Sequence, residues 1–266
     1  MAFTATLTHA QTAFDPDTGT VNQEALPPAL VDVGVDEHLE GTVPLDLGLT
    51  DENGKPVKLG DFFLGGKPVL FNFAYYRCPM LCNLVLAGMV EGIRNMAWVP
   101  GKEFEVVTLS IDPKEGPEQA SAKKKTHIEA LGSPEAADGW HFLTGQPKAI
   151  AALTEALGFR YHYNRATDDF SHTAVVFTLS PAGKICRYLY GIRYPPTDLK
   201  LALLEAKDNQ ALSMGDKLLM FCYHYDPKAK GYVLFAQNFM RGSGYLVLAA
   251  MLGLLGWLWM RKGMRP

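Results

Sequence analysis

The order of apolar and polar segments predicts a mixed α/β domain. Two continuous apolar runs of strand length, residues 67–75 and 104–112, are typical of strands buried on both faces of a sheet. Parallel strands need a crossover between them, and residues 79–96 have the pattern of such a helix. Two β-rich runs flank a turn at residues 181–183, which predicts an antiparallel hairpin, and a closing helix follows.

The remaining segments complete this plan. An Asn-Gly turn signal at residues 53–54 predicts a further β-hairpin before the first buried strand. Residues 117–132 predict a polar helix whose Lys123–Lys125 run faces solvent, and residues 147–158 predict a helix closed by a glycine. A βαβ unit joined to a ββα unit around a mixed sheet is a thioredoxin-like fold, with residues 60–208 as its body.

Changes in composition divide the chain into five expected segments. Residues 1–30 are polar and contain prolines, and the apolar periodicities lie in the part of the chain that follows. Residues 244–260 are uncharged and are followed by a basic end. The segments are a loose N-terminal extension (1–30), the thioredoxin-like domain (31–208), a juxtamembrane linker (209–243), a transmembrane helix (244–260) and a basic tail (261–266).

The expected transmembrane helix has no charged residue over residues 244–260. As a helix it would extend about 25 Å, the short end of a membrane span. Tyr245, Trp257 and Trp259 lie near its ends, where aromatic rings favour the membrane interface, and a buried core helix is the alternative. The start of the chain lacks a complete signal peptide, so we expect either a removed signal or a cytoplasmic domain on a tail anchor.

The composition excludes two broad classes of protein. The formal net charge is −3, which gives no electrostatic reason to expect nucleic acid as a partner. Hydrophobic residues make up 48% of the chain, enough for a sizeable core. Only four cysteines occur, so the chain is not a disulfide-stapled scaffold and each cysteine must be considered at its own position.

Two of these cysteines, Cys78 and Cys82, stand in "CPMLC" directly after the first buried strand. Pro79 suits a first helical turn, which makes Cys78 the expected N-cap and places Cys82 one turn further. Residues i and i+4 share a helix face, so the two sulfurs can converge. The helix N-terminus favours thiolate, the form that attacks disulfides and binds soft metals. A structural disulfide, a redox pair and a metal clamp all remain open.

A metal clamp of two thiolates needs a third ligand from elsewhere. Sulfur ligands select Cu(I) or zinc, and a mixed sulfur and imidazole set also accommodates Cu(II). His172 opens the expected strand of the C-terminal hairpin, which should lie against the cysteine loop; a surface position is the alternative. Cys186 is expected to be a small buried apolar residue. Cys222 and His224 form either an auxiliary copper site or part of an aromatic interfacial segment.

Three motifs in order, "CPMLC", "LSIDP" and "DDFSHTAVVFTLSPAGKICRYLYG", resemble the SCO/SenC family of copper-binding thioredoxin-fold proteins. The resemblance covers residues 30–208. Members of this family are assembly factors for the dinuclear copper centre of cytochrome c oxidase. The resemblance implies a copper ion held by Cys78, Cys82 and His172, with Asp112 near the metal but not bound to it.

The chain also departs from many members of that family. Asn83 stands where a proline is common, and Arg77 stands where small polar residues are common. A cation at this position should favour the thiolate further. The expected membrane span lies at the C-terminus instead of the N-terminus.

Three functions follow from these expectations. The first is a membrane-anchored copper chaperone for the copper-centre subunit of cytochrome c oxidase or another respiratory-complex component. The second is a thiol–disulfide oxidoreductase that reduces the cysteines of the acceptor copper site, with Cys78 and Cys82 as its redox pair. The third is a docking subunit of a respiratory complex. The resemblance implies the bacterial inner membrane as the location, with the domain facing the periplasm.

Overall fold

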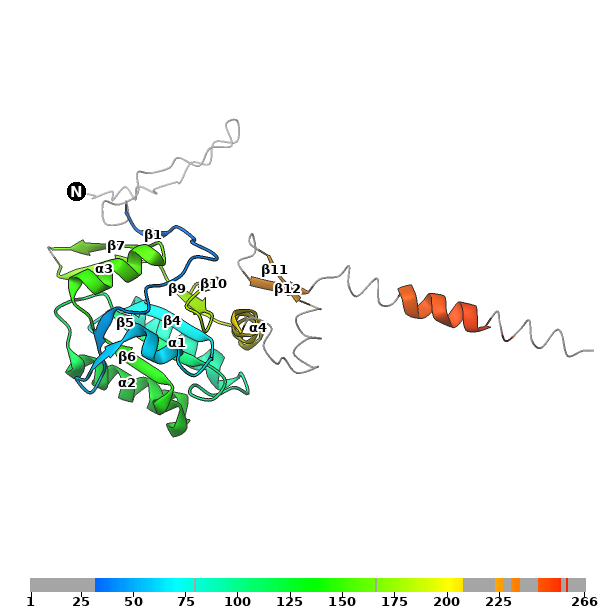
Figure 1. The fold of residues 1–266 in the computed structure, drawn as a ribbon, viewed down its shortest axis with the longest axis horizontal. Coiled ribbons are helices and arrows are strands. Elements are labelled where there is room, and N and C mark those ends of the chain that lie inside the picture. Colours follow the sequence, from blue (N-terminus) through cyan, green and yellow to red (C-terminus); the bar gives the residue numbers. More distant parts are fainter. Residues whose placement is uncertain are drawn as a thin grey trace, which may run out of the picture.

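The computed structural model describes residues 32–207 except 79 and 166, the backbone of 223–226 and 231–234, and residues 244–254 and 257. Its central sheet has five strands in the order β10-β9-β4-β5-β6 (Figure 1). They are β4 (Val69–Ala74), β5 (Glu105–Ser110), β6 (Trp140–Leu143), β9 (Val175–Leu179) and β10 (Ile185–Tyr190). β4, β5 and β6 are parallel, while β9 and β10 form an antiparallel hairpin. The predicted mixed sheet is confirmed.

Helices cover both faces of this sheet. The α-helices within residues 32–207 are α1 (Leu81–Arg94), α2 (Pro117–Leu131), α3 (Pro147–Ala156) and α4 (Pro196–Ala206). Two short 3-10 helices, η2 (Leu59–Phe63) and η3 (Pro134–Asp138), lie between them in sequence. α2 ends at Gly132, whose left-handed conformation (φ 73°) stops the helix as predicted.

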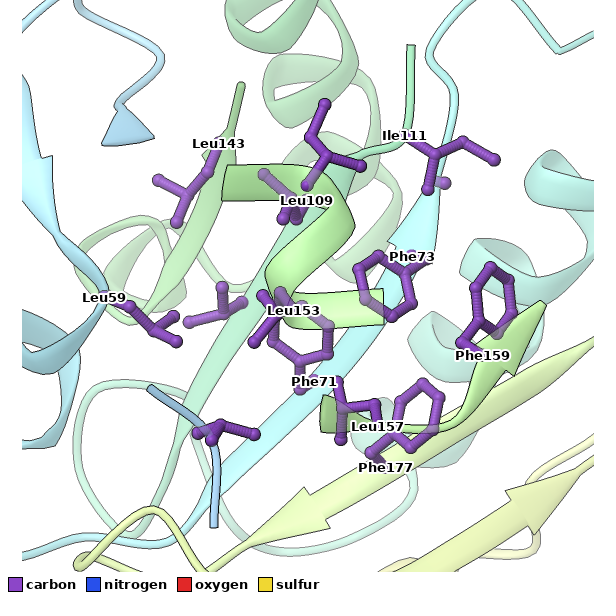
Figure 2. Packing of buried hydrophobic residues seen from close by; sticks show 14 of the residues in the cluster. Leu59, Phe71, Phe73, Leu109, Ile111, Leu143, Leu153, Leu157, Phe159 and Phe177 are labelled. Atoms are coloured by element: carbon purple, nitrogen blue, oxygen red, sulfur yellow. The ribbon is translucent and has the colours of Figure 1, made fainter. Parts of the chain in front are cut away.

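Alternate side chains of β4 enter two separate hydrophobic clusters. Phe71 and Phe73 belong to the cluster that contains Leu153 and Phe159, shown in Figure 2. Leu70 belongs to the other cluster, with residues of α1, α2 and α4. Because both faces are covered, β4 is apolar along its length except for the buried Asn72. The strand is therefore a rigid support for the cysteine loop at its carboxyl end.

Two glycines of α1 allow the chain after β10 to cross this helix closely. A Cβ atom on Gly88 would lie 2.2 Å from the Ile192 carbonyl oxygen, and one on Gly92 would lie 2.4 Å from the Tyr194 carbonyl oxygen. Glycine in a helix interior costs about 1 kcal/mol relative to alanine. The close crossing requires it here, and the crossing holds the helix whose first turn carries Cys82.

A second sheet has three strands in the order β1-β7-β8. These are β1 (Gly34–Val35), β7 (Phe159–Asn164) and β8 (Asp169–His172), and Tyr161 of β7 pairs with His172. The sequence did not predict this sheet. The expectation that His172 opens a strand of the C-terminal hairpin is wrong, because His172 is the last residue of β8 and β9 begins at Val175.

The expected hairpin around residues 53–54 is confirmed. Its strands are β2 (Gly48–Thr50) and β3 (Pro56–Lys58), which pair antiparallel. The hairpin is joined to the central sheet region by an isolated bridge between Thr50 and Thr144, next to the end of β6.

Beyond residue 207 the structure describes only short pieces. β11 (Tyr223–Asp226) pairs with β12 (Gly231–Leu234), so the expected linker contains a hairpin. Residues 244–254 are helical and exposed. Among the described residues, none of the helices has the length and apolar character needed to cross a membrane. Residues 255, 256 and 258–260 lie outside the described residues, so the span over 244–260 stays a prediction.

Candidate functional site

The cysteine loop connects the end of β4 to the start of α1. The Cys78 N–H donates to the Tyr75 carbonyl at 3.1 Å and closes a turn. Met80 is the N-cap of α1, and Cys82 is the second residue of the helix. The prediction that Cys78 is the N-cap is therefore wrong, because the helix begins later. Pro79, expected in the first turn, lies outside the described residues.

The helix start nevertheless acts on Cys78. The backbone N–H of Cys82 points to Cys78 Sγ at 3.3 Å, and such a first-turn N–H has no partner within its helix. A hydrogen bond from the Cys82 thiol, followed by the backbone N–H groups of Cys82 and Met80, lowers the pKa of Cys78 to about 5. The same thiol hydrogen bond and burial raise the pKa of Cys82. At neutral pH, Cys78 is the thiolate and Cys82 keeps its proton.

His172 lies against this pair at the end of β8. Its Nε2 is 3.0 Å from Cys82 Sγ, and its Nδ1 is 3.0 Å from the Thr173 carbonyl oxygen. A carbonyl only accepts hydrogen bonds, so Nδ1 carries the ring proton. Burial lowers the pKa of His172, which keeps the ring neutral. The lone pair of Nε2 therefore faces the Cys82 sulfur.

The three side chains converge, and together they have more hydrogen-bond acceptors than donor protons. The Cys82 thiol has one proton and two acceptors, the Cys78 thiolate and His172 Nε2. The Tyr75 N–H approaches the Cys82 sulfur at 3.4 Å and supplies one further donor. If the thiol proton leaves, two thiolates and an imidazole nitrogen face one another. This donor set suits a soft cation.

Aromatic rings and the sheet shield the three side chains from solvent. Cys78, Cys82 and His172 are 5%, 1% and 8% exposed. The ring centroids of Phe159 and Tyr75 lie 5.9 Å and 6.4 Å from that of His172. Neither cysteine forms a disulfide. The chemistry of the site is therefore that of reduced, largely desolvated sulfur.

Arg77 connects the cysteine loop to two other loops. Its backbone N–H donates to Glu115 at 2.8 Å, its Nη2 donates to Asp112 at 2.5 Å, and its Nη1 lies 3.4 Å from Asp168. These carboxylates engage the guanidinium, and Arg77 is not among the main groups that lower the pKa of Cys78. The expectation that Arg77 favours the thiolate is therefore not supported. It holds the loop in place instead.

Glu115 is a residue of this network that the sequence did not reveal. It is buried and accepts the backbone N–H of Tyr76 at 2.7 Å and the hydroxyl of Ser110 at 2.5 Å, besides the Arg77 N–H. Asp112 is 1% exposed and contacts Arg77, not the sulfurs. Both carboxylates thus act on the cysteine pair only through the position of its loop.

Asn83, the family departure after Cys82, links the cysteine loop to α2. Its side-chain nitrogen donates to the Cys78 carbonyl at 3.0 Å, and its oxygen accepts from Lys123 Nζ at 2.9 Å. Lys124 pairs with the buried Glu52. The prediction that the Lys123–Lys125 run simply faces solvent is therefore wrong for its first two members.

The other sequence candidates lie away from this convergence. Cys186 is buried in β10, as expected, and its thiol donates to the Lys184 carbonyl at 3.4 Å. Cys222 lies outside the described residues, and of His224 only the backbone in β11 is described. In the described part of the chain, no group of three or more His, Cys, Asp or Glu side chains is already spaced to hold a metal ion.

A family model described as SCO1/SenC matches residues 40–201, more than half of the chain. The chain belongs to the SCO1/SenC family. The matched range of this SCO1/SenC protein contains Cys78, Cys82 and His172, and all five strands of the central sheet. The mixed sheet, the cysteine loop and β8 are thus parts of one family domain.

The curated relatives of this SCO1/SenC protein include the mitochondrial SCO2 homolog of Homo sapiens, 27% identical over 155 residues. That match covers 55% of this chain and 53% of the human protein, so the chain spans about half the length of the curated relatives it matches. A solved structure of a candidate electron transfer protein from Aquifex aeolicus VF5 is 29% identical with a TM-score of 0.57, covering 64% of this chain and 95% of that chain.

Structures of Sco proteins show the same fold. BsSco, in which a disulfide switch was identified, is described as a member of the Sco family of cytochrome c oxidase assembly proteins. It is 20% identical with a TM-score of 0.52, covering 66% of this chain and 99% of that chain. Other Sco proteins, among them ScoI of Arabidopsis thaliana and of Bradyrhizobium japonicum, are solved with copper bound.

Proposed function

We propose that this protein binds one copper ion through Cys78, Cys82 and His172 and delivers it to the dinuclear copper centre of cytochrome c oxidase. The observation that carries the proposal is the contact of His172 Nε2 with Cys82 Sγ at 3.0 Å, beside the Cys78 thiolate. Membership in a family whose relatives are copper-bound and named for oxidase assembly supports it.

Copper binding would replace the thiol proton of Cys82. Cu(I) suits two thiolates and one imidazole because all are soft or borderline ligands. Cys82 Sγ and His172 Nε2 are in hydrogen-bond contact, so the ion would part them as the proton leaves to solvent. Nδ1 of His172 keeps its hydrogen bond to Thr173, which holds the ring in the orientation that presents Nε2.

Metal analysis of purified, reduced protein after reconstitution with Cu(I) tests this assignment. Cys78→Ser, Cys82→Ser and His172→Ala should each lose the one-to-one copper complex. Cys186→Ser is the matched control, because it alters a buried cysteine that lies outside the site. Undiminished one-to-one binding by the His172→Ala protein would contradict the three-ligand site.

The protonation of Cys82 gives a second readout. Cys78 has lost its proton above pH 5 and Cys82 has not, so binding near neutral pH should release one proton. The apparent Cu(I) affinity should then rise about tenfold per pH unit near neutrality. A chelator competition series measures it, with the chelator's own protonation taken into account. Affinity that does not change with pH would contradict the proton–copper exchange.

A second candidate function is thiol–disulfide exchange. It is favoured by the opposite pKa shifts of the two reduced cysteines, which make Cys78 the nucleophile and Cys82 the resolving thiol. Cys82→Ser should therefore trap a mixed disulfide at Cys78 with an acceptor that carries a disulfide, while Cys78→Ser should trap none. Absence of a trapped species in metal-free protein would count against this function.

We also propose that residues 244–260 anchor the protein in a bacterial inner membrane, with the domain on the periplasmic side. Support comes from the uncharged run with aromatic residues near its ends and from the basic residues after it. Protease added to intact spheroplasts should cleave the domain. Protection of the domain under these conditions would place it in the cytoplasm.

A further inference from the structure

The proposed copper ligands lie below the protein surface. Cys78, Cys82 and His172 are at most 8% exposed. An ion from solvent, or from another protein, must pass the residues that cover them before it reaches them. The residue that first meets the ion therefore affects how fast copper enters and leaves.

Met80 is an exposed residue that stands between the two cysteines in the chain. Its side chain is 69% exposed, and it is the N-cap of α1, between Cys78 and Cys82 in sequence. Met80 is two residues from each cysteine, and the Cys82 N–H reaches Cys78 Sγ at 3.3 Å, so the Met80 backbone lies in the turn that brings the pair together. Consecutive Cα atoms are about 3.8 Å apart, so the Cα atom of Met80 lies within about 7.6 Å of that of each cysteine.

The exposure of Met80 contrasts with its neighbours on α1 and beyond. Met89 and Met96 are at most 2% exposed and fill the hydrophobic core. Leu84, one turn after Met80, is 43% exposed and has no donor atom. Arg77 is partly exposed, but its positive charge is engaged by carboxylates and would repel a cation. Among the described residues of this loop and helix start, Met80 is the exposed one with a soft donor.

We propose that Met80 is the entry and exit ligand for Cu(I), an inference that rests on the proposed copper function of the site. A thioether is soft, uncharged and carries no proton, so it binds Cu(I) weakly and without competition from acid. The Met80–copper bond breaks as the bond to the Cys78 thiolate forms. Copper remains Cu(I), Cys82 releases its proton to solvent, and His172 contributes its Nε2 lone pair. The reverse order releases the ion to an acceptor.

Rapid-mixing kinetics test this role. Reduced protein is mixed without oxygen with the Cu(I) complex of bicinchoninate, and loss of the coloured complex reports copper transfer. Met80→Leu keeps size and apolarity but removes sulfur; it should slow transfer about tenfold, or about 1.4 kcal/mol in the barrier. Its equilibrium affinity should remain that of the wild type. Met89→Leu, the buried counterpart on the same helix, should load at the wild-type rate.

Direct binding to the thioether needs a readout that does not depend on the three ligands. In a Cys78→Ser/Cys82→Ser protein with labelled methionine methyl groups, Ag(I), a redox-inert substitute for Cu(I), should shift the NMR signal of Met80 and not that of Met89. The same protein with Met80→Leu should lack the shifted signal.

The two experiments separate the possible failures. If the wild type takes up no Cu(I), the three-ligand site is wrong, and the Ag(I) shift still reports on Met80. If the wild type binds Cu(I) but Met80→Leu loads at the same rate, Met80 is not the entry ligand. If Met80→Leu is normal and Met80→Ser is slow, the side chain acts by apolar contact, which also overturns the proposal.

Discussion

Two histidines of this protein are buried to nearly the same depth in different surroundings. His172 is 8% exposed and His127 is 6% exposed, and burial lowers the pKa of both. His172 has a carbonyl on Nδ1 and a sulfur on Nε2. His127, on α2, stacks on the rings of Trp140 and Phe142, and its Nε2 is buried without a hydrogen-bond partner.

The difference shows what makes a buried histidine a candidate ligand. Burial alone leaves a neutral imidazole, and both residues have that property. His172 differs because one nitrogen is committed to a backbone carbonyl, which fixes the ring, and the other meets a sulfur that carries an exchangeable proton. His127 has aromatic neighbours in place of donors and acceptors. Its ring packs against aromatic side chains, and it lines a surface pocket together with Lys123.

The largest expected effect is the difference in Cu(I) affinity between two variants in which either histidine is replaced by phenylalanine. His172→Phe should lower the Cu(I) affinity by roughly a hundredfold or more, because it removes one of the three proposed ligands. His127→Phe should leave that affinity unchanged, since His127 contacts neither sulfur. Competition titration against a Cu(I) chelator measures both. An equal loss of Cu(I) affinity in the two variants would contradict a copper site at His172.

The second largest effect concerns acid stability and His127. Burial, with a smaller contribution from Lys123, lowers the pKa of His127 to about 4. Its pKa in the unfolded chain is about 6.5, so the unfolded state takes up a proton first as the pH falls. Stability from neutral His127 is complete above pH 6.5 and is lost toward pH 4. Between pH 7 and pH 5 this loss is on the order of 2 kcal/mol.

The His127→Phe protein should lack this part of the pH dependence. Other groups, such as Asp168 with its lowered pKa, titrate in both proteins. Their contributions to the unfolding free energy cancel when the variant is compared with the wild type. Urea unfolding of metal-free protein at pH 7 and pH 5 gives the two differences in unfolding free energy. Equal losses in wild type and variant would show that His127 is protonated, or unfolded from its pocket, in the native protein.

Local sequence signals predicted most of the framework of the site. The apolar run at residues 67–75 predicted β4, and the glycines after α2 and α3 predicted where these two helices end. The position of CPMLC between a buried strand and a helix placed the cysteine pair at a helix start. These predictions succeeded because each depends on periodicity or turn chemistry within one segment.

Contacts between distant segments could not be predicted in this way. The β1-β7-β8 sheet depends on pairing of a two-residue strand with the segment after α3, and neither has a strong strand pattern. Glu115 is one acidic residue among many in the sequence, and only folding brings Tyr76 and Ser110 to it. The proximity of His172 to the cysteines was expected from its place before the hairpin strand and from the family resemblance, although its strand was assigned wrongly.

The third prediction concerns the source of the Cys78 thiolate. The Cys82 thiol is the largest cause of its lowered pKa, and His172 is not among the main causes. Cys82→Ala should therefore raise the pKa of Cys78 by at least about one unit, while His172→Phe should leave it near 5. The ultraviolet absorbance of the thiolate in metal-free protein follows the titration. A larger shift in His172→Phe than in Cys82→Ala would assign the thiolate to the imidazole instead.

The smallest predicted effect tests whether the two histidine regions are coupled. The charge of Lys123 lowers the pKa of His127 and, to a small extent, that of Cys82, and its amine also holds Asn83 against the cysteine loop. Lys123→Met removes the charge and keeps most of the side chain. Loss of the Cys82 proton should become harder, so Cu(I) affinity should fall, but by less than about tenfold.

Lys125→Met is the control for this last change, because it removes the same charge from an exposed position on the same helix. Screening by solvent should make its effect on Cu(I) affinity negligible. The Lys123 effect should persist in high salt, since the cation is partly buried and hydrogen-bonded to Asn83. If both variants lose affinity equally, α2 acts on the proposed copper ligands only through the net charge of the protein. A loss of Cu(I) affinity in Lys123→Met alone would show that the Lys123 cation couples the region of His127 to that of His172.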